Sequence, residues 1–424
     1  MNRRQFLGAA AAGASLSGRA VAASDKVNIA IIGAGGRGRH LTGNFVSQPD
    51  VNLRYLCDVD ERVLEKTLKV IDDRKAKRPA LLSDLRRVLD DKSIDAVVIA
   101  TPDHWHAPAT IMACDAGKDV YVEKPASHNL REGRLMVEAA RRNKRLVQLG
   151  TQSRTRPSTL RAMELIHSGK IGKVLAAKAW DVQLRDDIGH KENSPVPKGV
   201  DYETWLGPAP SLPFNENRFH YKWHWNWNFG TGDMGNDGVH QLDMARWALG
   251  VNMPERISGM GRKLFFDDDQ QTPDTMNITY DFKDKTLMFE MRIWNPYGME
   301  GQENGVAVYG STGMVHIGRW NRHWGYKVYD EKGNLAADES KHEDNTDTFH
   351  ARNFLDCVKS RKTPNAEIEI GHTSTVLCHL GNIVARTGRA LKFDPNTGTI
   401  AGDAEASRLL GRPYRKHWSV PKGV

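Results

Sequence analysis

Five short apolar runs constrain the fold of this chain more than any other feature, because helix-like segments alternate with them. The runs lie between residues 27 and 150 and read VNIAIIG, NLRYLCD, DAVVIAT, KDVYVEK and KRLVQLG. They are mostly continuous and rich in β-branched residues, as are strands buried on both faces of a parallel sheet. In the intervening segment LREGRLMVEAARRNK, Leu130, Met136 and Ala139 recur at roughly helical spacing. This alternation predicts an α/β fold with a doubly wound parallel sheet.

The pattern changes after Gly172, where the runs lengthen and apolar and polar residues alternate. These runs read VLAAKAWDVQL, MNITYDF, TLMFEMRIW, GVAVYGS and GMVHIGR. One face of TLMFEMRIW carries Leu287, Phe289, Met291 and Ile293. Period-two alternation joined by short turns predicts a large, mainly antiparallel sheet with one open face. Helical stretches at TFHARNFLDCVKS and TSTVLCHLGNIVART close the chain, so we expect two closely packed domains over residues 25–150 and 151–424.

Residues 1–24 have the layout of an export signal. Arg3 and Arg4 precede a short apolar stretch, and residues 20–22 form an A-x-A cleavage pattern. The segment NRRQFLG resembles a twin-arginine signal, whose pathway carries folded proteins; an ordinary secretory signal or a membrane anchor is the alternative. Because a bilayer span needs ~20 apolar residues, and no stretch of the chain is that long, we expect a periplasmic or otherwise exported protein that is not integral to the membrane.

The composition indicates a packed globular protein rather than a nucleic-acid-binding one. Hydrophobic residues make up 39% of the 424 residues, and the chain has 11 tryptophans. Its formal net charge of +8 includes three arginines of the leader, which leaves 57 basic against 52 acidic residues in the mature chain. This small excess is scattered, unlike a nucleic-acid footprint. The four cysteines are widely spaced and form no C-x-x-C pair; we expect small buried side chains, with a single bridge as the alternative.

A glycine-rich loop follows the first strand-like run directly. It reads Gly33-Ala34-Gly35-Gly36-Arg37-Gly38 and leads into a helical stretch. Glycines at this spacing allow a tight turn and let backbone amides approach a pyrophosphate at the helix N-terminus. An acidic residue about 20 positions later, Asp58, is placed to bind the ribose diol. Its carboxylate favours NAD over NADP, although Arg37 and Arg39 reduce that preference. A glycine turn that binds nothing is the alternative.

Two further polar segments, ATPDHWHAP and VEKPASHN, follow strand-like runs at the sheet edge where open α/β sheets bind ligands. Together with GAGGRG and the later GDMGNDGVHQLD, these segments give the chain its resemblance to the Gfo/Idh/MocA oxidoreductase family. The resemblance covers nearly the whole mature chain. It implies an NAD(P)-binding Rossmann domain over residues 25–150 and a substrate-binding and oligomerisation domain over residues 151–424, in a dimer or tetramer.

The resemblance also assigns roles to particular positions. Residues assigned to the cofactor, beyond the glycine loop and the ribose-binding acid, are Thr101, Pro102, His104, His106, Glu123, Lys124 and Gln152. Lys124, Asp237 and His240 match the catalytic trio, the last two as D-x-x-H. The chemistry agrees: a histidine with a reference pKa near ~6.5 suits proton abstraction from a hydroxyl, and an ammonium stabilises the alkoxide. Asp237 would orient the imidazole or bind a sugar hydroxyl, and Asp243 would cap or salt-bridge the following helix.

The stretch FHYKWHWNWNFG has an unusual composition that suits sugar binding. Trp223, Trp225 and Trp227 alternate with His224 and two asparagines, and flat rings beside hydrogen-bonding groups fit sugar faces and hydroxyls. We assign Trp223, His224 and Trp227 to the substrate together with Asp237 and His240. A tryptophan-rich packing seam between the domains is the alternative.

One further pocket assignment and one metal hypothesis come from other parts of the sequence. Arg154, in GTQSR after the last parallel run, is a further pocket candidate. The pairs His104/His106 and His220/His224 have the spacing of metal ligands, but no carboxylate cluster accompanies them in the sequence. We therefore expect no metal.

Export and nucleotide binding are compatible if the protein leaves the cytoplasm with its dinucleotide tightly bound. Such a cofactor must be reset within each cycle, which suits an oxidoreductase acting on a sugar or sugar derivative. An NAD-dependent glycoside hydrolase that oxidises, eliminates and reduces is the alternative within the resemblance. The glycosidases of this kind lack the lysine of EKP, so Lys124 favours a dehydrogenase. A non-catalytic sugar-binding protein with a structural nucleotide is a second alternative, and a metal-dependent isomerase ranks last.

Overall fold

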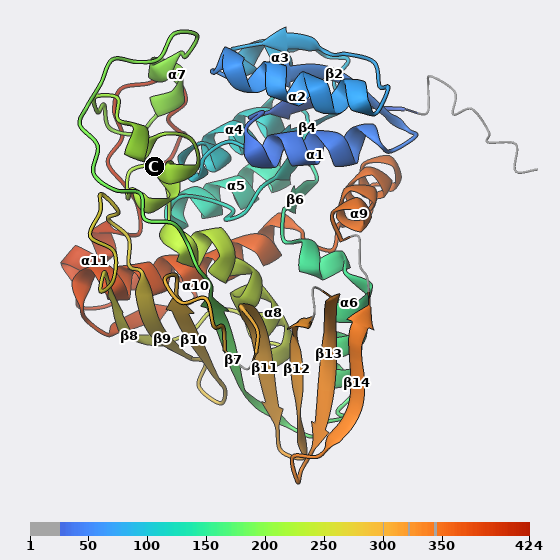
Figure 1. The fold of residues 1–424 in the computed structure, drawn as a ribbon, viewed down its shortest axis with the longest axis vertical. Coiled ribbons are helices and arrows are strands. Elements are labelled where there is room, and N and C mark those ends of the chain that lie inside the picture. Colours follow the sequence, from blue (N-terminus) through green and yellow to red (C-terminus); the bar gives the residue numbers. More distant parts are fainter. Residues whose placement is uncertain (1–25, 300, 321–322, 343–345) are drawn as a thin grey trace, which may run out of the picture.

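The protein is described here by a computed structural model of residues 26–299, 301–320, 323–342 and 346–424. The predicted export signal lies outside the described residues. Figure 1 shows a parallel sheet wrapped by helices in the N-terminal half, a large second sheet below it, and long helices between the two. The predicted fold class is confirmed: an α/β Rossmann-type domain is joined to an α+β domain with a mainly antiparallel, open-faced sheet.

The first sheet has six parallel strands in the order β3-β2-β1-β4-β5-β6. This is the order of a dinucleotide-binding Rossmann fold, whose ligands bind at the carboxyl ends of the strands. Every residue of β4 and β5 is buried, which explains why the strands read as continuous apolar runs. The strands are β1 (Val27–Ile32), β2 (Val51–Cys57), β3 (Ala80–Leu82), β4 (Ala96–Ile99), β5 (Asp119–Val122) and β6 (Val147–Leu149).

Helices cover both faces of this sheet. Several of them begin at a side-chain cap: Asp60, Asp84 and Asn129 each accept a hydrogen bond from a backbone N–H in the first turn of α2, α3 and α5. The helices are α1 (Gly36–Val46), α2 (Glu61–Asp73), α3 (Leu85–Asp90), α4 (Asp103–Asp115) and α5 (Leu130–Arg142).

The second sheet has ten strands in the order β14-β13-β12-β11-β7-β10-β9-β8-β15-β16, and only β7 and β10 pair in parallel among them. Leu287, Phe289 and Met291 of β10 are buried against the helices, whereas Glu290 lies on the open face, 3.2 Å from Lys178. The strands are β7 (Val174–Val182), β8 (Arg256–Arg262), β9 (Thr275–Asp281), β10 (Thr286–Arg292), β11 (Asn304–Gly310), β12 (Gly313–Trp320), β13 (His323–Asp330), β14 (Leu335–His342), β15 (Leu391–Asp394) and β16 (Thr399–Ile400).

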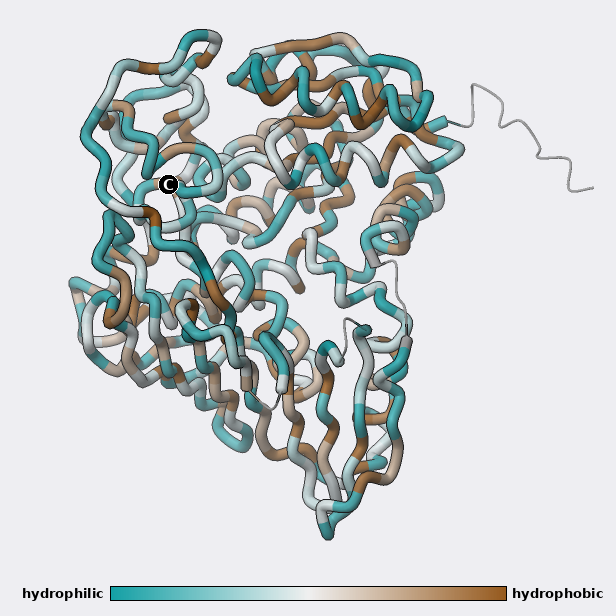
Figure 2. Tube along the Cα trace, in the orientation of Figure 1, coloured by the Kyte–Doolittle hydropathy of each residue, from teal (hydrophilic) through white to brown (hydrophobic). Residues whose placement is uncertain are grey.

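Helices α6, α8 and α10 cover the other face of this sheet, and α10 also packs against α5 of the Rossmann domain. Figure 2 shows the hydrophobic segments gathered in these two interiors, with hydrophilic residues alternating along the strands of the second sheet. The remaining helical elements are α6 (Pro157–His167), α7 (Tyr202–Leu206), α8 (Val239–Leu249), α9 (Thr346–Ser360), α10 (Ile368–Thr387) and α11 (Ala404–Arg408), with shorter turns η2 (Gln152–Thr155), η3 (Glu216–Arg218), η4 (His220–Trp225) and η5 (Met234–Gly238).

Helix α9 departs from the sequence-based division of the chain. Although it lies within residues 151–424, its Ala351, Phe354 and Leu355 belong to the core of the Rossmann domain, where Phe354 packs edge-on against Phe45 and Tyr121. The polypeptide therefore returns to the first domain before α10 completes the second.

All four cysteines lie within the described ranges, and each is buried and unpaired, as small apolar side chains are. Within the same ranges, no helix has both the length and the apolar character needed to cross a membrane.

Candidate active site

A cleft of about 820 Å³ opens at the carboxyl edge of the parallel sheet. Its floor is formed by the ends of β1, β2, β4 and β5. The side opposite this floor is formed by part of residues 197–224, which we call the capping segment. Among the sequence-predicted residues, those that line the cleft are Gly33, Gly35, Gly36, Arg37, Asp58, Thr101, Pro102, His106, Glu123, Lys124, Trp223 and His224.

The glycine loop combines positions that must be glycine with positions that are open. A Cβ on Gly38 would lie 1.8 Å from the carbonyl oxygen of Gly33, and Gly33 itself has a φ of +89°. A Cβ on Gly35 or Gly36 would meet no protein atom within 4 Å. The loop is therefore packed tightly where α1 meets β1, and it leaves room on the side of the cleft, as a pyrophosphate requires.

Asp58 stands at the end of β2, 24 residues after the loop residue to which it bonds. Its Oδ2 accepts a hydrogen bond from the Ala34 N–H at 2.6 Å, and its Oδ1 accepts one from the Asp60 N–H at 2.9 Å. Burial raises the pKa of Asp58 to about 6, against the lowering effect of these two bonds. Ala34 thus contributes through its backbone, while the carboxyl group faces the cleft.

At the other end of the cleft, the loop that begins α4 divides into two parts. Thr101, Pro102 and His106 line the cleft, and the His106 ring lies between the carbonyl oxygens of Thr101 (2.9 Å) and Pro125 (2.6 Å). The Thr101 hydroxyl is buried with no hydrogen-bond partner among the described residues. An unused buried donor at this position fits a bound group that the protein alone does not provide.

His104 points away from the cleft, contrary to the prediction that it binds the cofactor. Its Nε2 lies 2.9 Å from the carbonyl oxygen of Trp205, and its ring packs against those of Trp205 and Phe229. Because residues 104 and 106 are two positions apart on the helix α4, their side chains point in different directions. The His104 ring is therefore buried against Trp205 and Phe229 beneath the capping segment.

Glu123 is held by the glycine loop rather than by the solvent. Arg37 Nε donates to its Oε1 at 2.7 Å, and Arg37 Nη2 donates to Asp347 of α9 at 2.8 Å. Although burial opposes ionisation, Arg37 and Lys124 lower the pKa of Glu123 below its ordinary value. Gln152 Nε2 donates to the same carboxylate at 3.3 Å. Gln152 does not itself line the cleft, so its contact with Glu123 is a supporting one.

Lys124 reaches across to the second domain. Its Nζ donates to the backbone oxygen of Asn236 at 2.5 Å and to Asn236 Oδ1 at 3.1 Å. Asn236 lies in η5, a π-helical turn that runs directly into α8 and thereby places His240 one turn further on. The ammonium group therefore rests on uncharged oxygens at the end of the cleft where β4 and β5 finish.

His240 makes no hydrogen bond to any described residue. Burial and the nearby charge of Lys124 lower its pKa to about 4, while Asp237 opposes that shift. A histidine with this pKa is neutral near neutral pH, and a neutral imidazole can accept a proton.

The Asp237 side chain forms no hydrogen bond with His240, which differs from the orienting role that was one of the two expected for it. Its Oδ2 accepts from Gln183 Nε2 at 2.8 Å and from Arg185 Nη2. Arg185 also donates to Asp233 at 3.0 and 3.1 Å. The guanidinium group offers Asp237 a charge-assisted hydrogen bond, which a neutral imidazole cannot match.

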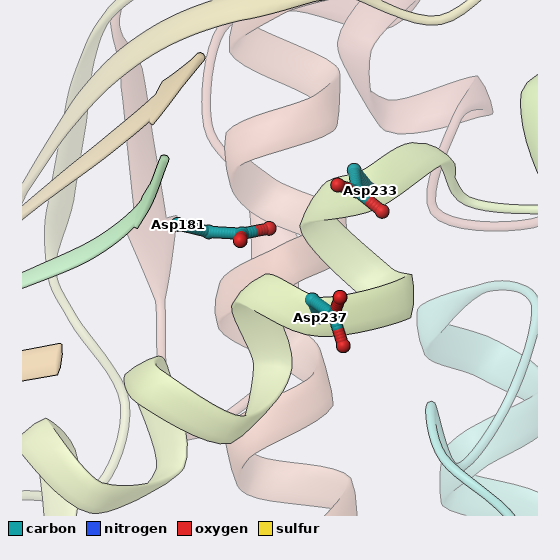
Figure 3. A group of neighbouring side chains, drawn as sticks. All are labelled: Asp181, Asp233 and Asp237. Carbon is teal, nitrogen blue, oxygen red and sulfur yellow. The ribbon is translucent and has the colours of Figure 1, made fainter. Parts of the chain in front are cut away.

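Three carboxylates gather around this arginine. Figure 3 shows Asp181, near the end of β7, pointing toward Asp233, which precedes η5, and Asp237, which lies within η5. Their oxygens lie within 4.8 Å of one another, a grouping of the kind that could hold a metal ion. The sequence spacing did not reveal this group, because Asp181 lies more than 50 residues before the other two. Arg185 supplies positive charge to two of the three carboxylates.

The predicted histidine pairs do not converge on a metal position. His220 Nε2 lies 2.8 Å from Asp60 Oδ2, and His224 Nδ1 contacts the carbonyl oxygen of Tyr221. His104 and His106 diverge, as described above. Each of these rings is directed by a different neighbour.

The tryptophans of the aromatic stretch divide between cleft and core. Trp223 lines the cleft and stacks on His224 with ring centroids 3.6 Å apart, whereas Trp225 is 1% exposed within the core of the second domain. The Trp227 ring lies 4.9 Å from the Arg386 guanidinium, outside the cleft lining and contrary to its predicted place.

Arg154 is also placed differently from the prediction that it contacts substrate. It is 5% exposed and forms a buried two-point ion pair with Asp243, through Nε and Nη2 at 2.8 Å each. This pair joins η2 to α8, and it makes Asp243 a salt-bridging residue of that helix.

Sequence reasoning missed three side chains at this end of the cleft: Asn236, Arg185 and Tyr221. Asn236 and Tyr221 line the cleft, and Arg185 acts electrostatically on Tyr221 and His224. Asn236 could have been identified from its position in GDMGNDGVHQLD, but the catalytic role was assigned to the neighbouring Asp237.

The capping segment is fastened to the Rossmann domain at the ribose end of the cleft. The Glu61 N–H donates to Gly199 O at 3.0 Å, the Asp201 N–H donates to Val59 O at 2.9 Å, and His220 contacts Asp60.

The C-terminal residues hold the outer side of the capping segment. Arg415 donates to the backbone oxygens of Gly207 and Glu203 at 2.6 and 2.7 Å, and Arg412 forms a buried ion pair with Glu132 at 2.7 Å. Figure 1 shows the C-terminus beside α7.

Two family models match the chain. A Gfo/Idh/MocA model described as "Oxidoreductase family, NAD-binding Rossmann fold" matches residues 27–151, and a second, "Oxidoreductase family, C-terminal alpha/beta domain", matches residues 175–420.

Curated relatives match part of the chain. A "Glycosyl hydrolase family 109 protein" of Saccharopolyspora erythraea is 31% identical over 182 residues, which cover 42% of this chain and 39% of that protein. An "Alpha-N-acetylgalactosaminidase" of Shewanella oneidensis is 28% identical over 190 residues, or 43% and 41% of the two chains. The chain thus matches about two-fifths of the length of these relatives.

Solved structures resemble the whole fold. The aldose–aldose oxidoreductase from Caulobacter crescentus, complexed with glycerol, has a TM-score of 0.67 at 19% identity and covers 87% of this chain and 100% of its own. The WlbA dehydrogenase from Bordetella pertussis, in complex with NADH and UDP-GlcNAcA, has a TM-score of 0.65 at 19% identity, with coverage of 87% and 99%.

The contrast between Gly38 and Gly35 gives a prediction. Gly38→Ala should lower the free energy of unfolding by about 1–3 kcal/mol, because the added methyl group collides with the backbone of Gly33. Gly35→Ala should change that free energy by less than about 0.5 kcal/mol yet lower NAD content at least tenfold, since its methyl group enters the cleft. Urea unfolding and the nucleotide content of the purified variants measure both. Equal effects of the two substitutions on either quantity would contradict this reading of the loop.

The environment of His240 gives a second prediction, measured by NMR titration of the histidine ring signals and assigned with His240→Asn. The signal should stay that of a neutral ring as pH falls to about 5 and change only near the pKa of about 4. In Lys124→Met the pKa of His240 should rise, because the ammonium group that opposes protonation is gone. A midpoint near the ordinary histidine pKa, or no response to Lys124→Met, would show that the two groups do not interact.

Proposed function

The chain belongs to the Gfo/Idh/MocA oxidoreductase family, and we propose that it is an exported, NAD-dependent enzyme that oxidises a carbinol carbon of a sugar or sugar derivative on a tightly bound cofactor. The observation that carries this proposal is the meeting of Lys124 and Asn236 at one end of a cleft whose other end is the glycine loop and Asp58. A cationic side chain is thus presented where a nicotinamide and a substrate hydroxyl would meet.

The residues of the cleft fit a dinucleotide. The open space at Gly35 and Gly36 accommodates a pyrophosphate at the N-terminus of α1, the Asp58 carboxylate is placed for a ribose diol, and the unused Thr101 hydroxyl lies toward the nicotinamide end. When bound, NAD supplies the acceptor for a hydride.

The chain's own groups would handle the proton and the developing charge. His240, neutral at physiological pH, would take the proton from the reacting hydroxyl. Lys124, held by uncharged oxygens of Asn236, would stabilise the alkoxide that results. Asp237 would bind a substrate hydroxyl, because its side chain is 30% exposed.

The ribose end supports NAD rather than NADP. A half-buried carboxylate at Asp58, in the cleft lining, would repel a 2′-phosphate. Arg62, on the same rim, is engaged by Asp60 at 2.7 Å and is therefore less able to offset that repulsion.

Tight retention of the cofactor is supported by the capping segment. It contributes His220, Tyr221 and Trp223 to the wall of the cleft, and it is tied to the ends of β2 and α2 on one side and to the C-terminal residues on the other. Release of a dinucleotide would require several of these contacts to break together. An exported enzyme needs this, because it meets no free nucleotide outside the cytoplasm.

A homo-oligomer formed through the open face of the second sheet is part of the same proposal. Met260, Met288 and Tyr309 expose 44%, 37% and 37% of their surface on strands of that sheet. Exposed apolar side chains gathered on a sheet face are typical of subunit contacts.

Sugar specificity is supported by the aromatic wall of the cleft and by the relatives. Trp223 and His224 present a stacked pair of flat rings at the substrate end. A glycosidase that oxidises, eliminates and then restores its substrate is the second candidate, and it is favoured by the relatives named for glycosyl hydrolase family 109. The lysine at position 124 supports the oxidoreductase.

Lys124→Met tests the proposal directly. Sugars added to NAD-containing protein should reduce the bound cofactor, seen as the absorbance of reduced nicotinamide. Because the variant lacks the charge that stabilises the alkoxide, it should do so at least ~100-fold more slowly while retaining its NAD. Lys92→Met, at a position exposed on the Rossmann surface, is the matched control.

Chromogenic glycosides separate the two candidates. Release of the aglycone without accumulation of reduced cofactor would establish the glycosidase. Reduction of cofactor by free sugars with no cleavage would establish the oxidoreductase. Undiminished reduction by Lys124→Met would contradict the assigned role of this lysine.

A further inference from the structure

Arg185 lies close to the substrate end of the cleft, and its charge is already paired with two carboxylates. It follows the end of β7, its side chain is 18% exposed, and its charge acts on the cleft residues Tyr221 and His224. Two carboxylates share this guanidinium: Nε and Nη2 donate to Asp233, and Nη2 also donates to Asp237. A carboxylate or phosphate on a substrate would normally seek such a guanidinium.

Asp181 is the third carboxyl group of this cluster, next to Asp233 and Asp237. The residue is fully buried, its Oδ1 accepts from Gln183 at 2.6 Å, and its Oδ2 has no hydrogen-bond partner among the described residues. Burial and the neighbouring Asp233 and Asp237 raise its pKa well above the ordinary range. Asp233 and Asp237 both accept hydrogen bonds from Arg185, so two carboxylates share one guanidinium.

The most exposed carboxylate of this group has an oxygen that can still accept a hydrogen bond. Asp237 Oδ2 is used by Gln183 and Arg185, whereas its Oδ1 accepts no hydrogen bond from any described residue. With the side chain 30% exposed, that oxygen is free to accept from a sugar hydroxyl. An anionic substituent at the same place would meet a carboxylate instead, and like charges brought together are unfavourable.

We propose that this site selects uncharged sugars and excludes those that carry a carboxylate or phosphate, and that Asp233 and Asp237 set this preference by holding Arg185. The inference rests on the proposed function and specifies its substrate class. Neutral sugars gain hydroxyl contacts to Asp237, whereas sugar acids meet a guanidinium whose charge is already balanced by two carboxylates.

Matched sugar pairs test the proposal. Dissociation constants for glucose against glucuronate and galactose against galacturonate are measured on the NAD-containing protein by isothermal titration calorimetry. The neutral member of each pair should bind at least about tenfold more tightly. Asp237→Asn keeps the shape of the side chain but frees Arg185 from one carboxylate, so the preference should fall at least tenfold. Asp233→Asn should act in the same direction.

Asp115→Asn is the matched control, because it removes an exposed carboxylate of α4, paired with Arg142, and should leave the preference unchanged. Uronates that bind wild-type protein as tightly as the neutral sugars, or a preference unaffected by both Asp237→Asn and Asp233→Asn, would overturn the proposal. So would a protein that contains NAD and binds neither class. The proposed function has separate readouts, the NAD content and the reduction of bound cofactor, so the two failures are distinguishable.

Discussion

The contact between Lys124 and Asn236 is the interaction on which the site depends, because it brings one group from each domain to a single point. Lys124 follows β5 of the Rossmann sheet, and Asn236 belongs to the turn that starts α8. The domains are held in this relation by deeper contacts, including the buried pair of Arg154 and Asp243 and the packing of α10 against α5. Without this alignment the lysine would be an exposed cation and His240 an ordinary helix residue.

Electrostatic pairing distributes the charges of the cleft unevenly. Arg37 is engaged by Glu123 and Asp347, and Arg185 by Asp233 and Asp237, whereas the ammonium group of Lys124 rests on amide oxygens. The ammonium group of Lys124 is thereby held by uncharged oxygens where an alkoxide would form, and its charge adds to burial in lowering the pKa of His240. Arg37 and Arg185, which are already paired with carboxylates, are therefore less available to bind a substrate anion.

The sequence was most informative where structure is local. Continuous apolar runs predicted five parallel strands correctly, because a strand in the interior of a parallel sheet consists mainly of apolar residues. The sixth strand, β3, was missed because its residues are largely exposed at the sheet edge. In the second sheet β8 is interrupted by glycines and β14 is mostly polar, so neither showed alternation. The return of α9 to the Rossmann core could not be predicted, since its apolar face fits either domain.

For the site, the sequence motifs indicated which segments reach the cleft, but they did not indicate the direction of each side chain. Gly35, Thr101 and Lys124 line the cleft as their motifs predict. His104 and Arg154 do not, because the partners that direct them, Trp205 and Asp243, lie about 90 to 100 residues away in sequence.

The most direct test is native mass spectrometry of protein from the exported fraction, purified without added nucleotide. We expect a homo-oligomer of chains that lack the leader, with one NAD or NADH retained per chain. Chains that hold no dinucleotide and take up none when NAD is added would contradict an exported enzyme that works on a resident cofactor.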